Sequence, residues 1–165
     1  MHEIALDSLD FALLNQLQID CSLNNHALSK RVHVSPPTCL RRVKRLLDAG
    51  LIERQIALLD TDLLALRIGH GLTAIVEITL DRQHQEAVQE FERRVAPDAA
   101  VQQCYQVSPG PDFILVIHAN DMPGYLALSQ RLFTSDANVR NVKAFFSIRR
   151  AKFEPSVALV RPPRA

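Results

Sequence analysis

The spacing of apolar residues changes near residue 50, and this change constrains the fold more than any other feature. Before it, Leu9, Leu13 and Leu17 recur every four residues, which is typical of one face of a helix. Between Leu72 and Leu80 the apolar residues occupy every second position, which predicts a strand. The chain is therefore expected to fold as a helical part followed by a part built on a sheet.

Three helices are predicted in the first fifty residues. Asp7 is placed to cap the first, and Asp10 lies in its first turn, where a negative charge suits the positive end of the helix dipole. The second is expected over residues 26–32. Ser35 caps a third helix whose first two positions are prolines, which are tolerated there because those N–H groups have no helical partner. Gly50 is the expected stop of the third helix.

The third helix has two kinds of residue at helical spacing. Leu40, Val43 and Leu47 step by three and four, so they are predicted to face the core. Four basic residues fall between them and are predicted to face largely outward: Arg41, Arg42, Lys44 and Arg45. Residues 26–54 carry seven bases and two acids, a net charge of +5, whereas the whole chain carries +1. A solvated helix face is the plain alternative to a binding surface for such a run of charge.

A short helix, a tight turn and a second helix with a basic face are typical of a helix-turn-helix, whose second helix enters the major groove of double-stranded DNA. Its first turn would meet base edges or phosphates, and its cations would reach the groove or the flanking backbone. The residues predicted to contact DNA are Ser35, Pro37, Thr38, Arg41, Arg42, Lys44 and Arg45. The alternative function is a metabolite-binding or assembly module whose helical domain serves protein interaction. The four cations favour DNA, because such a module does not need them on one face.

From residue 72 the pattern predicts the order strand-helix-strand, strand-helix-strand, the ferredoxin-like arrangement. Its strands are expected at residues 72–80, 101–107, 113–118 and 142–148, and its helices around Phe91 and Leu128. The predicted fold class is α+β, with an N-terminal three-helix helix-turn-helix domain followed by a ferredoxin-like βαββαβ domain. The expected bounds are a DNA-binding domain at 1–50, a linker with a short strand at 51–71, the ferredoxin-like domain at 72–152 and a tail at 153–165. The tail is expected to be disordered from Arg161.

The chain resembles the Lrp/AsnC family of bacterial transcription regulators. The resemblance rests on LDSLD at residues 6–10, SPPTCLRRVKRL at 35–46, ALLD at 57–60 and DF at 112–113, and it extends from residue 6 to residue 152. It implies that the C-terminal half dimerises through its sheet. It also implies that dimers assemble into rings or discs, commonly octamers, and that small amino acids bind between dimers.

Four positions depart from the family pattern. His33 stands where the turn before the third helix usually has glycine, and histidine adopts a positive φ only at some cost. Residues 54–55 are Arg-Gln in place of the usual Gly-Tyr pair. Pro109 replaces a glycine in the turn between the second and third strands, and Ala144 replaces a threonine in the last strand.

The resemblance places an amino-acid pocket at the turn 108–112, the start of the second sheet-covering helix and the last strand. The residues predicted to line it are Ser108, Gly110, Asp112, Met122, Ala144, Phe146 and Ser147. Asp112 would bind the ligand ammonium, and Ser108 with the N–H of Gly110 would bind its carboxylate. Pro109 and Ala144 each lack a donor, so weak binding is expected, with an apolar side chain such as that of leucine or methionine. In the alternative, Asp112 only caps the turn.

One face of the predicted sheet is left without helices. Ile75, Val107, Phe113 and Phe145 are expected to be exposed on it, and so apolar a face needs a partner, which the dimer supplies.

Other classes of protein find little support in the sequence. The six histidines pair with no carboxylate or cysteine at a recognisable catalytic spacing, and no phosphate-binding loop is present, so no catalytic residue and no cofactor is predicted. The three cysteines are scattered, without metal-ligand spacing, and read as buried thiols of a cytoplasmic protein. No metal site, membrane span or signal peptide is predicted.

Overall fold

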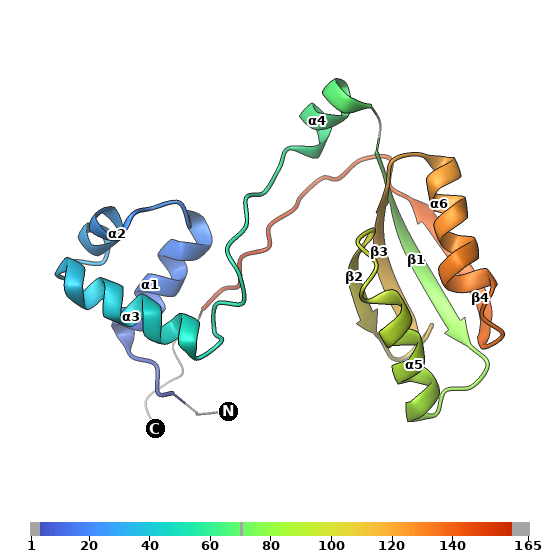
Figure 1. Cartoon of the computed structure of the whole chain (residues 1–165), viewed down its shortest axis with the longest axis horizontal. Coiled ribbons are helices and arrows are strands. Elements are labelled where there is room, and N and C mark those ends of the chain that lie inside the picture. Colours follow the sequence, from blue (N-terminus) through green and yellow to red (C-terminus); the bar gives the residue numbers. More distant parts are fainter. Residues whose placement is uncertain (1–3, 70, 160–165) are drawn as a thin grey trace. The chain divides into compact units, whose positions relative to one another are not determined.

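The computed structural model describes residues 4–69 and 71–159, and the chain forms two compact units (Figure 1). The first consists of Met1–Leu58 together with Lys152–Ala165, and the second is Leu59–Ala151. His2, His70 and the tail from Arg161, for which disorder was expected, lie outside the described residues.

Three helices make up the first unit: α1 (Ser8–Ile19), α2 (Asn25–Arg31) and α3 (Pro36–Asp48). Their side chains meet in a small core of Leu13, Leu28, Cys39 and Leu46. The predicted cap of α1 is confirmed, because the Asp7 carboxylate accepts the N–H groups of Leu9 and Asp10. The Asp10 carboxylate in turn accepts the N–H of Asp7, which completes a capping box.

α3 begins and ends where its sequence predicts. The face that it turns toward the core differs from the predicted one. Two prolines begin the helix, and Gly50, at φ 72°, ends it. The prediction that Leu40 and Leu47 face the core is wrong, since their side chains are 60% and 42% exposed. Cys39 and Leu46, one position earlier in each case, are fully buried instead. A one-residue shift turns a helix by about 100°, so the whole outward face changes.

Residues 51–60 follow α3 without a strand, so the short strand predicted in the linker is wrong. These residues are nearly all exposed and have no partner strand within the described chain. A helix, α4 (Thr61–Ile68), which was not predicted, lies within the linker.

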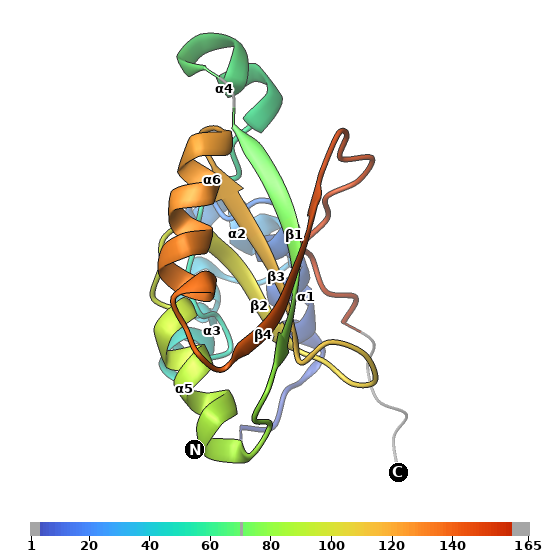
Figure 2. The same ribbon diagram turned by 90° about the vertical axis from the view of Figure 1, so that its right-hand side faces the viewer.

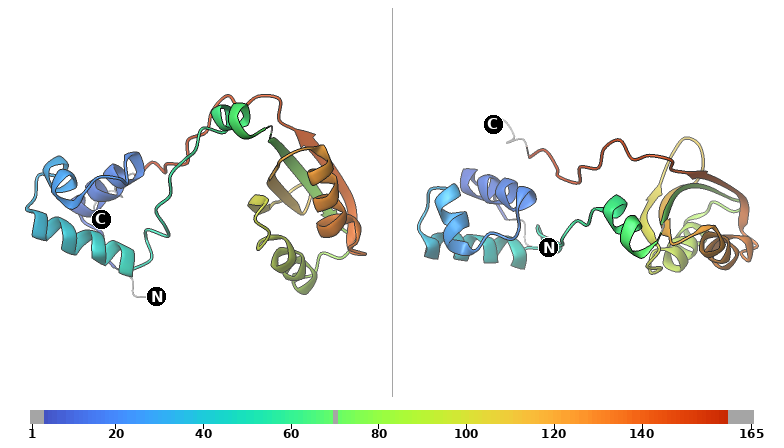
Figure 3. Two further views of the ribbon diagram at one scale, coloured as in Figure 1. Left: turned by 45° about the horizontal axis from the view of Figure 1, so that its top comes forward. Right: turned by 90° about the horizontal axis from the view of Figure 1, so that it is seen from above.

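The second unit is a four-stranded antiparallel sheet in the order β2-β3-β1-β4. Its strands are β1 (Leu72–Leu80), β2 (Val101–Gln106), β3 (Phe113–Ala119) and β4 (Val139–Phe146). Two helices, α5 (Gln85–Val95) and α6 (Met122–Ser129), cover one face, and α6 continues into a π-helical turn, η1 (Gln130–Thr134) (Figures 2 and 3). The ferredoxin-like βαββαβ order is confirmed.

The core of this unit lies between the sheet and its two helices. Phe91, Phe113 and Phe133 are buried in it, with the Phe91 and Phe113 ring centroids 4.7 Å apart. The expectation that Phe113 is exposed is wrong, because it has the same parity along β3 as the buried Leu115 and Ile117. Ile75 and Phe145 are 43% and 44% exposed and pair across β1 and β4.

The C-terminal segment returns to the helical unit. The Gln18 side-chain amide donates to the Val157 carbonyl at 3.1 Å and accepts the Val157 N–H at 2.6 Å. These paired bonds fix the segment against the end of α1 within the first unit.

Candidate nucleic-acid interface

The turn between α2 and α3 has the tight form of a helix-turn-helix. His33 has φ 56°, so histidine adopts the left-handed conformation for which the family usually has glycine. The N–H of Val34 donates to the Ser29 carbonyl, and the Asn25 side chain donates to the Pro36 carbonyl at 2.9 Å. The Asn25–Pro36 hydrogen bond therefore fixes the starts of α2 and α3 to each other across the turn.

Hydroxyl groups lie at the exposed start of α3. Ser35 is its N-cap residue, but its hydroxyl makes no hydrogen bond to the helix backbone. It lies instead 2.9 Å from the Thr38 hydroxyl. Pro36 and Pro37 remove two N–H groups from this end, and Pro37 is exposed. Ser35, Pro37 and Thr38 thus lie together in the first turn, as predicted.

Two of the four cations predicted on α3 are on its outward face. Arg41 and Lys44 are exposed, and within residues 4–69 and 71–159 neither forms an ion pair. Lys30 and Arg31, in the last turn of α2, are also exposed. These two were not among the residues predicted to contact DNA, although they belong to the same basic segment, and that charge was the signal that could have identified them.

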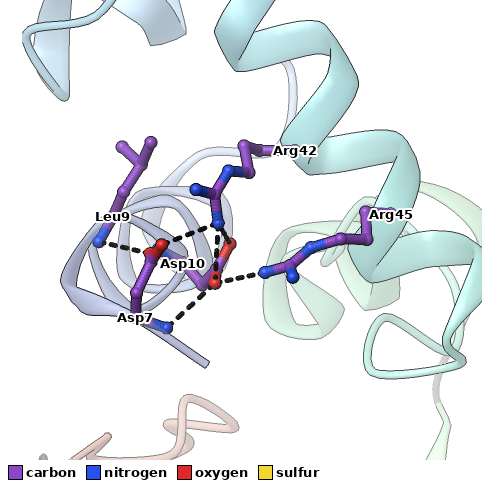
Figure 4. A network of polar contacts seen from close by, with 5 residues as sticks. All are labelled: Asp7, Leu9, Asp10, Arg42 and Arg45. Carbon is purple, nitrogen blue, oxygen red and sulfur yellow. Dashed lines mark hydrogen bonds and ion pairs between the residues drawn. The ribbon is translucent and has the colours of Figure 1, made fainter. Parts of the chain in front are cut away.

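Arg42 and Arg45 are partly buried and point toward the acids of α1, so the prediction that they face largely outward is wrong (Figure 4). Arg42 Nη1 lies 2.8 Å from an Asp7 carboxylate oxygen and 3.2 Å from both oxygens of Asp10. Arg45 forms an ion pair with the same Asp10 carboxylate, whose side chain is fully buried. The one-residue rotation of α3 explains this placement, because positions 42 and 45 flank the buried stripe that contains Cys39 and Leu46. We call these four charged residues the α1–α3 clamp.

Contacts within the clamp favour the charged forms of Asp7 and Arg42. The N–H of Asp10 donates to the Asp7 carboxylate, and with Arg42 nearby it holds the pKa of Asp7 below its ordinary value. The hydrogen bond from Arg42 to Asp7 raises the pKa of Arg42. Arg45 Nε is buried and has no hydrogen-bond partner in the described chain. The charge of two α3 arginines is therefore offset within the unit itself.

Most of the residues predicted to form an effector pocket lie at two opposite ends of the sheet. The Asp112 carboxylate accepts the Leu80 N–H at 2.7 Å, which places the turn 108–112 at the end of β1. Gln83 also donates to this carboxylate, at 3.3 Å. Ser108 and Gly110 are exposed in the same turn. These bonds of the Asp112 carboxylate thus join the turn to the end of β1 and do not lie within the turn.

Met122, Phe146 and Ser147 lie near the start of β1, whereas Ala144 lies beside its middle. Ser147 donates its N–H to the Thr73 carbonyl, and the Phe146 ring meets the Tyr125 ring edge-on at 5.0 Å. Met122 begins α6 and is 42% exposed. Ala144 lies opposite Val76 and packs against the core. Thr73 and Leu80 stand near the two ends of β1, roughly 23 Å apart at the rise of a strand. A single chain therefore does not bring the two groups together.

A cavity of about 430 Å³ in this unit includes Ser147 but no other predicted pocket residue. Among its lining residues are Thr73, His118 and Arg149, and α4 contributes Leu64 and Ile68. The described residues contain no cluster of histidine, cysteine and acidic side chains able to hold a metal ion. Nor do they contain a helix long and apolar enough to cross a membrane.

Comparison with known proteins decides the family. Residues 6–53 match the winged helix-turn-helix DNA-binding family, and residues 73–157 match the Lrp/AsnC ligand binding domain. The chain belongs to the Lrp/AsnC family. It is a DNA-binding transcription regulator of Lrp/AsnC type, with a ligand-binding domain.

Relatives within the Lrp/AsnC family match most of the chain. The leucine-responsive regulatory protein of Haemophilus influenzae is 40% identical over 75% of this chain and 72% of its own length. That of Escherichia coli K12 is 38% identical over 74% and 73%. The structure of a Neisseria meningitidis transcriptional regulator in complex with L-Met has a TM-score of 0.80 and 29% identity, covering 93% of this chain and 96% of that one. The helix-turn-helix and the four-stranded sheet of this Lrp/AsnC protein are thus the two parts of a known regulator fold.

Proposed function

We propose that this regulator binds the major groove of double-stranded DNA through the exposed face of α3. The observation that carries the proposal is the outward pair Arg41 and Lys44, which no acid of the described chain neutralises. Ser35, Pro37 and Thr38 contribute the first turn, from which a recognition helix reaches base edges. Lys30 and Arg31 at the end of α2 bind flanking phosphates. Arg42 and Arg45 act within the clamp and do not contact DNA.

The test is the affinity of the protein for duplexes from its own promoter region, measured by fluorescence anisotropy at rising salt concentration. Phosphate contacts release counterions, so the logarithm of the association constant should fall linearly with the logarithm of the salt concentration. A symmetric dimer reads symmetric half-sites, so the bound sequences should be degenerate inverted repeats. Equal, weak affinity for all duplexes would contradict sequence-specific regulation.

The regulator also assembles with copies of itself. The helix-free face of the sheet carries Ile75 and Phe145 side by side, with Val116 and Tyr105 on the neighbouring strands. Two such faces packed together bury these side chains. The ion pair between Glu77 and Lys143, whose charged atoms are 3.7 Å apart, lies next to them on the same two strands. This supports a dimer through the sheet, and the family resemblance supports octamers of such dimers. Light scattering that gives only the 18.5 kDa monomer at micromolar concentration would refute it.

The ligand of the second unit is a small amino acid with an apolar side chain, such as leucine or methionine. Its support is the relative from Neisseria meningitidis in complex with L-Met, together with the apolar Met122 and Phe146. Because one chain holds the turn 108–112 and these two residues at opposite ends of β1, the pocket takes the two groups from different copies. Calorimetry against the twenty amino acids tests the proposal, and absence of binding by leucine and methionine contradicts it.

A further inference from the structure

Leu40 occupies the middle of the proposed DNA interface. It is the fifth residue of α3, and its side chain is 60% exposed. Pro37 precedes it by three positions, while Arg41 and Lys44 follow it by one and four, and all three are exposed. Positions three and four apart lie side by side on a helix, so Pro37 and Lys44 lie on either side of Leu40.

A leucine at this position is suited to contact an apolar group on the edge of a base pair. The major-groove edges of the four base pairs carry hydrogen-bond donors and acceptors, and their one apolar group is the C5 methyl of thymine. Leucine offers no hydrogen bond, so against any other edge it would desolvate polar atoms without replacing their partners. We propose that Leu40 contacts a thymine methyl in each half-site and is a specificity-determining residue of this regulator. The proposal rests on the proposed DNA binding by α3.

The charges beside Leu40 select DNA over a protein partner. An apolar protein surface that covered Leu40 would also bury the Arg41 and Lys44 charges, at a cost in desolvation. A DNA groove presents an apolar methyl in its floor and phosphates along its edges, so it satisfies all three side chains. The cations provide affinity without regard to sequence, and Leu40 provides discrimination.

The experiment replaces thymine by deoxyuridine, which removes the methyl and leaves every hydrogen-bonding group of the base unchanged. The probe is the tightest duplex that the full wild-type chain selects from a random library, with each thymine replaced in turn. The wild type should bind about fourfold more weakly at one position of each half-site, the effect expected for one buried methyl group. Leu40→Ala should bind the thymine and deoxyuridine forms of that position equally.

Leu47→Ala is the matched control. Leu47 is also an exposed leucine of α3, 42% exposed, but it lies two turns nearer the C-terminal end, away from the residues that meet base edges. This variant should keep the fourfold preference for thymine. Leu40→Ala should unfold at the wild-type temperature and keep the wild-type dependence of affinity on salt, because Leu40 does not bind phosphate.

The outcomes separate the two proposals. If no duplex is selected, the proposed DNA binding fails. If a duplex is selected but deoxyuridine costs nothing at any position, or if Leu40→Ala keeps the preference for thymine, DNA binding stands and the role of Leu40 is overturned.

Discussion

The Asp10 carboxylate lies 3.2 Å from Arg42 Nη1, although 32 residues separate the two in sequence. Asp10 is fully buried and also accepts the Asp7 N–H and the Arg45 guanidinium. One carboxylate thereby joins the first turn of α1 to the middle of α3. The position of α3 is thus fixed by charged residues on the side that packs against α1.

Asp10→Asn should lower the free energy of unfolding of the helical unit. The variant keeps the shape of the side chain but loses the negative charge that two arginines face. A hydrogen bond to a charged group contributes about 1.5–3 kcal/mol, and a loss in that range is expected. Chemical denaturation followed by circular dichroism measures it. The matched control is Asp48→Asn, an exposed acid of α3, which should unfold like the wild type. Equal midpoints for both variants would show that the clamp does not stabilise the unit.

The clamp should also make stability depend on acid. The pKa of Asp7 is below its ordinary value of 3.8, so this carboxylate contributes stability above that pH. The contribution is lost as the pH falls through the lowered pKa of the folded state. Below about pH 4 the wild type should therefore lose more stability than Asp7→Asn, while Arg42 stays charged throughout. Parallel acid-unfolding curves for the two proteins would contradict this.

Arg41→Ala and Lys44→Ala should each weaken DNA binding, because each removes a cation that neutralises a phosphate. The slope of the logarithm of affinity against the logarithm of salt concentration should become shallower by about 0.9 for each phosphate that is no longer neutralised. Arg42→Ala should leave this slope unchanged, because its guanidinium binds Asp7 and Asp10. Salt titrations with a single duplex measure all three. A shallower slope for Arg42→Ala would return this residue to the DNA interface.

Ile75→Glu should prevent assembly through the sheet. It places a charge on the helix-free face, where Ile75 is 43% exposed beside Phe145, and burial of an unpaired charge in a dimer is unfavourable. Light scattering should report the monomer mass. Leu126→Glu, on an exposed position of α6 that covers the other face, should still form the sheet dimer. A dimeric Ile75→Glu variant would contradict the proposed face.

Asp112→Asn should separate the two roles of this residue. An asparagine oxygen still accepts the Leu80 N–H, so the turn 108–112 should keep its structure. The negative charge for a ligand ammonium is removed, so amino-acid binding should weaken in calorimetry. Affinity equal to that of the wild type would show that Asp112 only caps the turn.

The sequence predicted most of the helices and strands but not the faces they present. In α3, Cys39 and Leu40 are adjacent, as are Leu46 and Leu47, so two apolar stripes about 100° apart fit the same spacing. When Cys39 and Leu46 face the core, Arg42 and Arg45 reach the buried Asp10 of α1. The spacing of apolar residues in α3 alone does not reveal this contact with α1.

The candidate sites were predicted unevenly for a similar reason. The first turn of α3 is local, so Ser35, Pro37 and Thr38 could be placed from the capping pattern. The resemblance groups effector residues from the turn 108–112 with Met122 and Phe146, which in one chain lie at the other end of β1. Spacing along a chain carries no information about which copy supplies which residue.

The hydrogen bonds between Gln18 and Val157 have a consequence for the mechanics of the molecule. The chain leaves the helical unit after Leu58 and re-enters it at Lys152, so the helices are attached to the sheet covalently after Leu58 and a second time through the C-terminal segment, which hydrogen bonds hold to α1. A body on one tether can swivel about it, whereas a body on two can turn only as far as their slack allows. Cutting the chain after Ala151 would remove the second connection. The helical unit could then rotate about the single remaining linker.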